Sequence, residues 1–244
     1  MIKSSYFERA HLFHFFTDRI ITNMNAQQQK EAVAKAALAY IPEDKILGLG
    51  TGSTVDCLIA LLPTLPFKIK GVASSSERTS KQVEALGIPI VDLADITTID
   101  TYIDGADEIN HHLAMVKGGG GALTREKIVA AHASQFVCIA DESKLVETLG
   151  AFPLPIEVIP MAAHFVIRKM EQMGATAQIR EGFITDNHNL IVDVKDLKIT
   201  SPIQLEASIN QITGVVTNGL FAARGADVLL MADKDLNIRT LTKK

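Results

Sequence analysis

The stretch Lys45-Ile-Leu-Gly-Leu-Gly-Thr-Gly-Ser-Thr54 joins a short apolar run to a glycine-rich turn. We interpret Lys45–Leu49 as a buried strand. Apolar side chains then recur at helical spacing, at Val55, Leu58, Ile59 and Leu62. This spacing predicts a helix directly after the turn. A strand, a turn and a helix in this order are typical of an α/β fold, in which helices cover a sheet.

The alternation of strands and helices continues on both sides of this unit. Before it, a helix is expected over residues 26–40, and Pro42 follows as its stop. After it, we expect strands over residues 69–73, 88–91, 101–103 and 135–140, and helices over residues 76–86 and 124–133. Repeated alternation favours a parallel, Rossmann-like sheet with helices on both faces.

The character of the sequence changes around Phe152-Pro-Leu-Pro155, where two prolines predict a crossing between domains. Beyond it, we expect strands over residues 156–159, 176–180 and 190–194, helices over residues 163–173 and 202–209, and a last strand beginning within residues 214–216. This β-α-β-β-α-β order is typical of a split βαβ, ferredoxin-like domain of the α+β class. Strand-like segments at 227–231 and 237–241 follow. We therefore expect a Rossmann-like catalytic domain over residues 24–150, completed by residues 226–244, and a smaller domain over residues 151–225.

Composition and charge exclude several classes of protein. The 244 residues are 47% hydrophobic but only 5% aromatic, so the interior is expected to consist mainly of Ile, Val, Leu and Ala. The net charge is −4 and no dense block of Lys and Arg is present, which argues against a nucleic-acid partner. No apolar run approaches the ~20 residues of a membrane span, so no membrane partner is expected.

The two cysteines and the segment before Met24 indicate in which cellular compartment the protein is expected. Cys57 and Cys138 are far apart and form no disulfide framework, which favours free thiols in the cytoplasm. Charged side chains interrupt the apolar residues before Met24, so this segment is a poor signal peptide. A second methionine, Met24, opens a more regular stretch, so we expect residues 1–23 to be an upstream start or an accessory N-terminal tail.

The turn Gly50-Thr-Gly-Ser-Thr54 is a candidate anion site. Its glycines allow a close approach of the backbone to a ligand, and the N-terminus of the next helix directs N–H groups outward. Ser53 and Thr54 add hydroxyl groups. The stretch is neither a Walker A loop nor a G-x-G-x-x-G dinucleotide motif. By itself it is compatible with a phosphate cradle or with an ordinary strand-to-helix turn.

The segment Asp104-Gly-Ala-Asp-Glu108 follows the apolar strand at 101–103. Ligands of open α/β sheets bind just beyond the carboxyl ends of strands. Three carboxylates in five residues at such a place indicate a solvated acidic turn, a ligand site or a divalent-metal site. The metal alternative is disfavoured because no His or further acidic cluster completes a shell of metal ligands. We interpret the nearby pair His111-His112 as part of a polar loop.

The segment Lys117-Gly-Gly-Gly-Gly-Ala-Leu-Thr-Arg-Glu126 leads into an expected helix. Four consecutive glycines are unfavourable in chain entropy, but they can form a nest of N–H groups that binds an oxyanion. Lys117 adds a positive charge at the edge of this nest, and Glu126 falls near the same mouth. Lys144, in Asp141-Glu-Ser-Lys144, again follows a strand, although a lone lysine in a loop is usually solvated.

Taken in order, these motifs resemble the ribose-5-phosphate isomerase A family. The resemblance runs from about Met24 to the C-terminus. It includes Phe152-Pro-Leu-Pro-Ile-Glu-Val-Ile-Pro160, the Thr185-Asp-Asn187 turn and Gly214-Val-Val-Thr-Asn-Gly-Leu-Phe221. One local departure is Gly121, where many family members carry alanine.

The resemblance implies an aldose–ketose isomerase of the non-oxidative pentose phosphate pathway. It would interconvert D-ribose 5-phosphate and D-ribulose 5-phosphate through an enediolate, with no cofactor and no metal. Glu126 matches the general base of the family. Asp104 and Asp107 match residues that contact the sugar and assist ring opening and proton transfer. The residues that match donors to the enediolate are Lys117, Gly118, Gly119 and Gly120. The remaining matches to the substrate-binding site are Thr51, Gly52, Ser53, Thr54, Gly105, Ala106 and Lys144, and Lys30 is a further candidate for the phosphate.

The resemblance also implies a homodimer or homotetramer whose small-molecule partner is the sugar phosphate. Two alternatives belong to other classes. One is a different enzyme on a similar scaffold, such as a CoA transferase or an amino-sugar phosphate deaminase, against which Glu126 argues. The other is a non-catalytic sugar-phosphate sensor, which would need a separate DNA-binding module.

Overall fold

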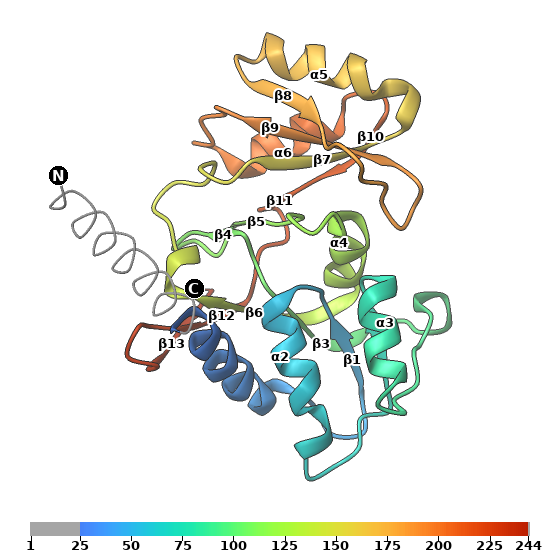
Figure 1. Cartoon of the computed structure of the whole chain (residues 1–244), viewed down its shortest axis with the longest axis vertical. Helices are drawn as coiled ribbons and strands as arrows, with labels where there is room; N and C mark the ends of the chain where they lie inside the picture. The colour runs from blue at the N-terminus through green and yellow to red at the C-terminus, as the bar shows by residue number, and fades with distance from the viewer. Residues whose placement is uncertain (1–24, 244) are drawn as a thin grey trace, which may run out of the picture.

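A six-stranded sheet forms the centre of the larger part of the molecule (Figure 1). The computed structural model describes residues 25–243, so the tail expected at residues 1–23 lies outside the described residues. Neighbouring strands are parallel except β12 and β13, which are antiparallel. In spatial order the strands are β13 (Ile238–Thr242), β12 (Val228–Ala232), β6 (Ala133–Asp141), β3 (Ile99–Asp104), β1 (Ile46–Leu49) and β2 (Gly71–Ser74). The expected Rossmann-like sheet is confirmed.

Helices cover both faces of this sheet, as its buried strands require. Side chains of successive strand residues alternate between the faces, so Ile103 packs in one apolar cluster and Tyr102 in the other. The first cluster includes Val33, from the helix of residues 25–37, and Leu58. The second includes Val129. The labelled helices of this part are α2 (Ser53–Leu61), α3 (Glu77–Glu84) and α4 (Leu123–His132).

The smaller part of the molecule contains a four-stranded antiparallel sheet (top of Figure 1). In spatial order its strands are β10 (Val215–Asn218), β7 (Leu154–Val158), β9 (Leu190–Lys195) and β8 (Thr176–Ile179). The helices α5 (Ala163–Gln172) and α6 (Pro202–Asn210) contribute to the same apolar core. The expected ferredoxin-like β-α-β-β-α-β order is therefore confirmed.

The strand expected over residues 88–91 is wrong. Only Ile90 forms a parallel bridge, to Val72 at the outer edge of β2. Pro89 lies in the middle of this segment and has no N–H group for a ladder, which confines it to the edge of a sheet.

Short elements between the two larger sheets were not expected. A three-stranded sheet has the order β11 (Leu220–Phe221), β5 (Met115–Val116) and β4 (Glu108–Ile109), and it lies between the two parts of the molecule in Figure 1. Strands of two residues are too short to produce a periodic pattern. The 3₁₀ turns are η1 (Leu38–Tyr40), η2 (Leu62–Thr64), η3 (Leu93–Asp95), η4 (Glu142–Lys144) and η5 (Pro160–Ala162).

No helix of residues 25–243 is long and apolar enough to span a membrane.

Candidate active site

A cavity of about 480 Å³ opens beyond the carboxyl ends of β1, β3 and β6. These three strands are neighbours in the parallel sheet, so the segments that follow them meet at one edge. The cavity is lined by residues 26, 30, 51–55, 78, 105–107, 117–120, 126, 139–141, 143 and 144. Every predicted site residue except Asp104 lines it.

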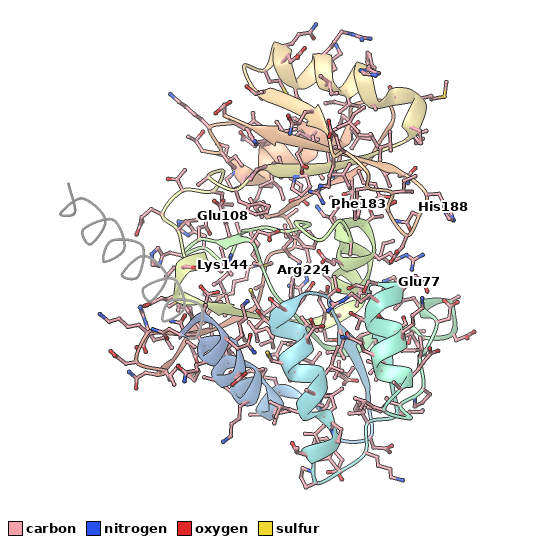
Figure 2. All side chains as sticks on the ribbon, in the orientation of Figure 1. Glu77, Glu108, Lys144, Phe183, His188 and Arg224 are labelled. Carbon is pink, nitrogen blue, oxygen red and sulfur yellow. The ribbon has the colours of Figure 1, made fainter. Side chains whose placement is uncertain are left out.

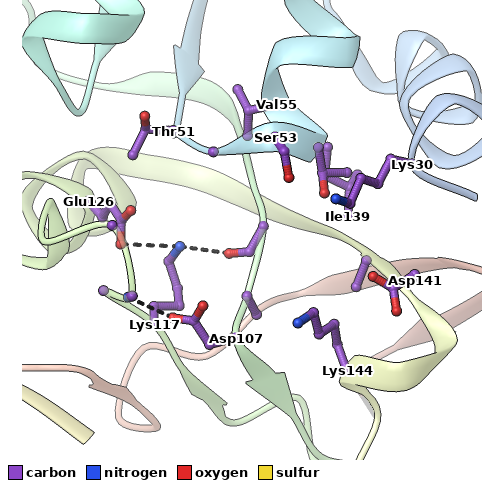
Figure 3. Close-up of a pocket in the computed structure, with 18 of the residues that line it drawn as sticks. Lys30, Thr51, Ser53, Val55, Asp107, Lys117, Glu126, Ile139, Asp141 and Lys144 are labelled. Carbon is purple, nitrogen blue, oxygen red and sulfur yellow. Dashed lines mark hydrogen bonds and ion pairs between the residues drawn. The ribbon is translucent and has the colours of Figure 1, made fainter. Parts of the chain in front are cut away.

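One end of the cavity is suited to an anion. The backbone at Gly52 has a φ of 121°, and α2 begins directly afterwards with no side chain capping its first turn. Within the described part of the chain, the N–H groups of Ser53, Thr54 and Val55 have no protein acceptor, as expected at the start of a helix. Figure 3 shows Lys30 and Lys144 at the same end of the cavity as Ser53. Two positive charges and three N–H groups can bind a phosphate there.

Asp104 lies beneath the cavity instead of lining it. Its side chain is completely buried, and protein donors surround both oxygens. Oδ1 accepts hydrogen bonds from the N–H groups of Thr51 (3.2 Å) and Gly105 (2.7 Å). Oδ2 accepts from Tyr102 Oη (2.5 Å) and Lys117 Nζ (2.6 Å). In this arrangement Asp104 holds Lys117 and the loop at Thr51, and the expected contact with the sugar stays a prediction.

The other two carboxylates of this segment point elsewhere. Asp107 lines the cavity and accepts a hydrogen bond from the N–H of Gly119 at 2.8 Å. Glu108 turns toward the connection to the smaller domain and accepts from the N–H groups of Gly150 and Phe152, each at 2.6 Å (Figure 2). The three carboxylates therefore do not share a site. Within residues 25–243, no three His, Cys, Asp or Glu side chains are grouped to hold a metal ion.

Lys117 forms the floor of the cavity and is almost completely buried. Its Nζ lies 2.6 Å from Asp104 Oδ2. It also lies 2.6 Å from the carbonyl oxygen of Gly105 and 3.2 Å from Glu126 Oε2 (Figure 3). Burial alone would lower the pKa of Lys117, but the charges of Asp104 and Glu126 outweigh it and raise the pKa above its ordinary value. The ammonium group is therefore a fixed positive charge.

Glu126 stands in the first turn of α4, and only 3% of its surface is exposed. Burial raises the pKa of Glu126 above its ordinary value, Lys117 opposes that shift, and Asp104 adds to it. Glu126 Oε2 lies 3.2 Å from Lys117 Nζ, yet it has no well-formed hydrogen bond within the described chain. A buried carboxylate with a raised pKa and a free oxygen can accept a proton from a bound molecule.

The glycine run forms a tight turn above Lys117. The N–H of Gly121 donates to the carbonyl oxygen of Gly118 at 2.9 Å, and both residues have positive φ, 80° and 95°. A Cβ on Gly119 would lie 2.6 Å from Asp107 Oδ1, so a larger residue here would displace the Asp107 carboxylate. The N–H of Gly119 is already bound to Asp107, whereas that of Gly120 has no acceptor among the described residues. Gly120 is thus available to bind an oxyanion.

The sequence analysis gave several of the lining residues no role in the site. Arg78, on α3, reaches the cavity and forms an ion pair of 2.5 Å with Asp56 on α2. Ile139, Ala140, Asp141 and Ser143 also line it. Arg78 stands outside every motif, and only the packing of α3 beside α2 brings it to the site. The others follow or end a predicted strand, which was the signal that could have found them.

Comparisons with known proteins identify the family of the chain. Residues 71–236 match the family model described as ribose 5-phosphate isomerase A (phosphoriboisomerase A). A ribose 5-phosphate isomerase A from Neisseria gonorrhoeae is 43% identical over 90% of this chain and 98% of its own, with a TM-score of 0.87. One from Methanocaldococcus jannaschii is 40% identical over 88% of this chain and 98% of its own, with a TM-score of 0.82. A D-ribose-5-phosphate isomerase in complex with phospho-erythronic acid is 36% identical over 89% of this chain and 99% of its own, with a TM-score of 0.85.

Proposed function

The chain belongs to the ribose 5-phosphate isomerase A family, and we propose that the cavity beside Glu126 is where it interconverts D-ribose 5-phosphate and D-ribulose 5-phosphate. The observation that carries the assignment is the juxtaposition of a buried carboxylate, a buried ammonium and a glycine turn. Glu126 Oε2 and Lys117 Nζ are 3.2 Å apart, and Gly118, Gly119 and Gly120 line the same cavity. An aldose–ketose isomerisation needs a base for carbon and donors for an enediolate, and these groups supply both.

The phosphate of the substrate binds at the end of the cavity formed by the 51–54 loop. The N–H groups at the start of α2 and the hydroxyls of Ser53 and Thr54 donate to its oxygens. Lys30 and Lys144 supply positive charge. Because these groups stand apart from Glu126 in Figure 3, the phosphate fixes one end of the sugar while the chemistry proceeds at the other.

Glu126 removes the proton from C2 of the open-chain aldose. The electron pair of the broken C–H bond forms the C1–C2 double bond, and negative charge develops on O1. Lys117 and the N–H groups of the glycine run, Gly120 foremost, stabilise that oxygen, and each well-placed donor of this kind contributes about 10²–10³ in rate. Asp107 moves the proton between O2 and O1, and Glu126 then returns its proton to C1. Asp104 positions Lys117 and assists ring opening through it.

We also propose a homodimer or homotetramer in the cytoplasm, with the division into domains 24–150 plus 226–244 and 151–225. Exposed apolar side chains on the smaller domain support self-association, among them Met161 at 94% and Val216 at 40% exposure. The free thiols of Cys57 and Cys138 are compatible with a reducing compartment. Light scattering on the eluting protein measures the subunit number, and a monomer at micromolar concentration would refute the oligomer.

The test of function is the conversion of ribose 5-phosphate to ribulose 5-phosphate by the purified full-length protein, after EDTA treatment and with no cofactor added. Rapid conversion is expected. A folded protein that binds ribose 5-phosphate without converting it would be a sensor or an enzyme for another substrate. The roles given to Glu126 and Lys117 would then be withdrawn.

A further inference from the structure

A side chain of the smaller domain holds the glycine run from outside the cavity. Arg180 follows β8, and its Nη1 donates to the carbonyl oxygens of Gly119 at 3.0 Å and Gly118 at 3.4 Å. The same guanidinium is fixed by Asp193, which accepts from Nε at 2.8 Å and from Nη2 at 2.6 Å. Arg180 does not line the cavity, so any effect on a substrate passes through the glycine backbone.

The geometry of the peptide bond gives this contact a direction. In a trans peptide the C=O and the following N–H lie in the peptide plane and point in opposite directions. Arg180 binds the oxygen of the Gly119–Gly120 peptide, and Gly120 lines the cavity. The N–H of Gly120 is therefore turned away from Arg180, toward the side on which the substrate lies. In the same way, the contact of Arg180 with the Gly118 oxygen sets the direction of the Gly119 N–H, which donates a hydrogen bond to Asp107.

One further contact attaches the turn to the smaller domain, and a second contact joins Arg180 to the residue that makes it. The ring of Phe183 fills the space beside Gly121, where an added Cβ would lie 2.1 Å from Phe183 Cζ. The guanidinium of Arg180 is 5.4 Å from the centre of the same ring. A run of four glycines has little conformational preference of its own, so its orientation depends on contacts such as these.

We propose that Arg180, oriented by Asp193, is a positioning residue that aligns and polarises the Gly119–Gly120 peptide as a donor to the enediolate. Its positive charge on the carbonyl oxygen strengthens the N–H on the other side as a hydrogen-bond donor. The inference rests on the proposed function, because it takes the glycine run to be the oxyanion site. The smaller domain then contributes to catalysis although none of its residues lines the cavity.

The experiment compares Arg180→Met and Arg180→Lys with a matched control, Arg224→Met. Arg224 also pairs with an aspartate, Asp227 at 2.7 Å, and donates to two carbonyl oxygens, of Gly225 at 2.7 Å and Ala133 at 3.3 Å. It makes no contact with the glycine run. For each full-length protein, kcat and KM for ribose 5-phosphate and the inhibition constant of phospho-erythronic acid are measured. The carboxylate of that acid resembles the enediolate in charge and shape.

Arg180→Met is expected to lower kcat by about 10-fold to 100-fold, less than the loss of an oxyanion donor itself, because the N–H group remains. KM stays close to the wild-type value, and the inhibition constant of phospho-erythronic acid rises in proportion to the loss of kcat/KM. The kcat of Arg180→Lys is expected to lie between those of the wild type and Arg180→Met, since a lysine keeps the charge without bridging Asp193 and the glycine oxygen. Arg224→Met keeps the wild-type kcat.

Three outcomes would overturn the inference. The first is an unchanged kcat in Arg180→Met. The second is a lower kcat in Arg180→Met while phospho-erythronic acid binds no more weakly relative to the substrate. That result would indicate a general loosening of the structure around the site. The third is an equal loss in Arg224→Met. A wild-type protein that fails to convert ribose 5-phosphate would refute the proposed function as well, whereas the three outcomes above require an active wild type.

Discussion

Replacing Glu126 with glutamine removes the proposed base while keeping the shape of the side chain. The oxygen concerned, Oε2, accepts no well-formed hydrogen bond within the described residues, so the amide loses only the charge interaction with Lys117 Nζ, 3.2 Å away. Lys117 keeps its contacts with Asp104 and the Gly105 carbonyl, each at 2.6 Å, and its position is retained. The expected effect is therefore confined to proton transfer.

The size of the effect follows from the role of a general base, which is worth ~10²–10⁴ in rate. At about 1.36 kcal/mol for each factor of ten, the barrier rises by about 3–5 kcal/mol. KM is expected to change little, because the groups proposed to bind the other end of the substrate, in the 51–54 loop and at Lys30 and Lys144, are unchanged. The assay measures steady-state kcat and KM for ribose 5-phosphate, with Glu171→Gln on the exposed face of α5 as the control.

Thermal unfolding provides a second, independent measurement on the same variant. Burial raises the pKa of Glu126, so the folded wild type is stabilised in the protonated form relative to the unfolded chain, where a glutamate ionises near pH ~4.3. The wild type consequently loses stability as pH rises from that value through the raised pKa. Glutamine does not titrate, so Tm of the variant minus Tm of the wild type should increase with pH over this window. A variant with near-normal kcat, or a Tm difference that falls with pH, would refute the reasoning.

Three more predictions follow from the site. In the wild type, kcat/KM should rise with pH through an inflection above the ~4.3 of a solvated glutamate, because Glu126 must be ionised and burial raises its pKa; an inflection at or below that value would contradict the assignment. Lys117→Ala should lower kcat more than it raises KM, and urea unfolding should show a loss of about 3–5 kcal/mol, because two buried carboxylates, Asp104 and Glu126, lose their counter-charge; a defect in KM alone would argue against the enediolate contact. Gly121→Ala should lower the free energy of unfolding by about 1–3 kcal/mol, because φ is +80° and Phe183 occupies the position of the new methyl group; Phe183→Ala in the same chain should recover part of the loss, and additive effects would contradict the contact.

Much of the fold was predictable from local patterns. The buried strands at Ile46–Leu49 and Ala133–Asp141 are apolar runs bounded by turn residues, and they form as expected. The segment at residues 88–91 has the same apolar character, but Pro89 limits it to one bridge at the edge. The two-residue strand Met115–Val116 pairs with Leu220–Phe221, far away in the sequence, and no local pattern can predict such a pairing.

The candidate site likewise has features that were predictable from the sequence and features that were not. The motifs that hold Glu126, Lys117 and the glycine run were visible because unusual residue types are adjacent in the chain. The side-chain direction of Asp104 was not visible, since a residue at the end of a strand can turn into the cavity or beneath it. Arg78 and Arg180 stand alone in their segments, and tertiary packing alone brings them to the site.

The order of the strands has a consequence for the synthesis of the protein. β12 pairs with the buried strand β6, yet it follows the whole smaller domain in the chain. While the ribosome is still translating the segment before Val228, β6 is an open edge flanked by apolar side chains, which is the kind of surface on which nascent chains associate wrongly. We therefore expect a chain truncated before Val228 to aggregate, because β6 keeps an unpaired edge. The sheet whose strands end at the candidate active site is therefore completed only after the smaller domain has been synthesised.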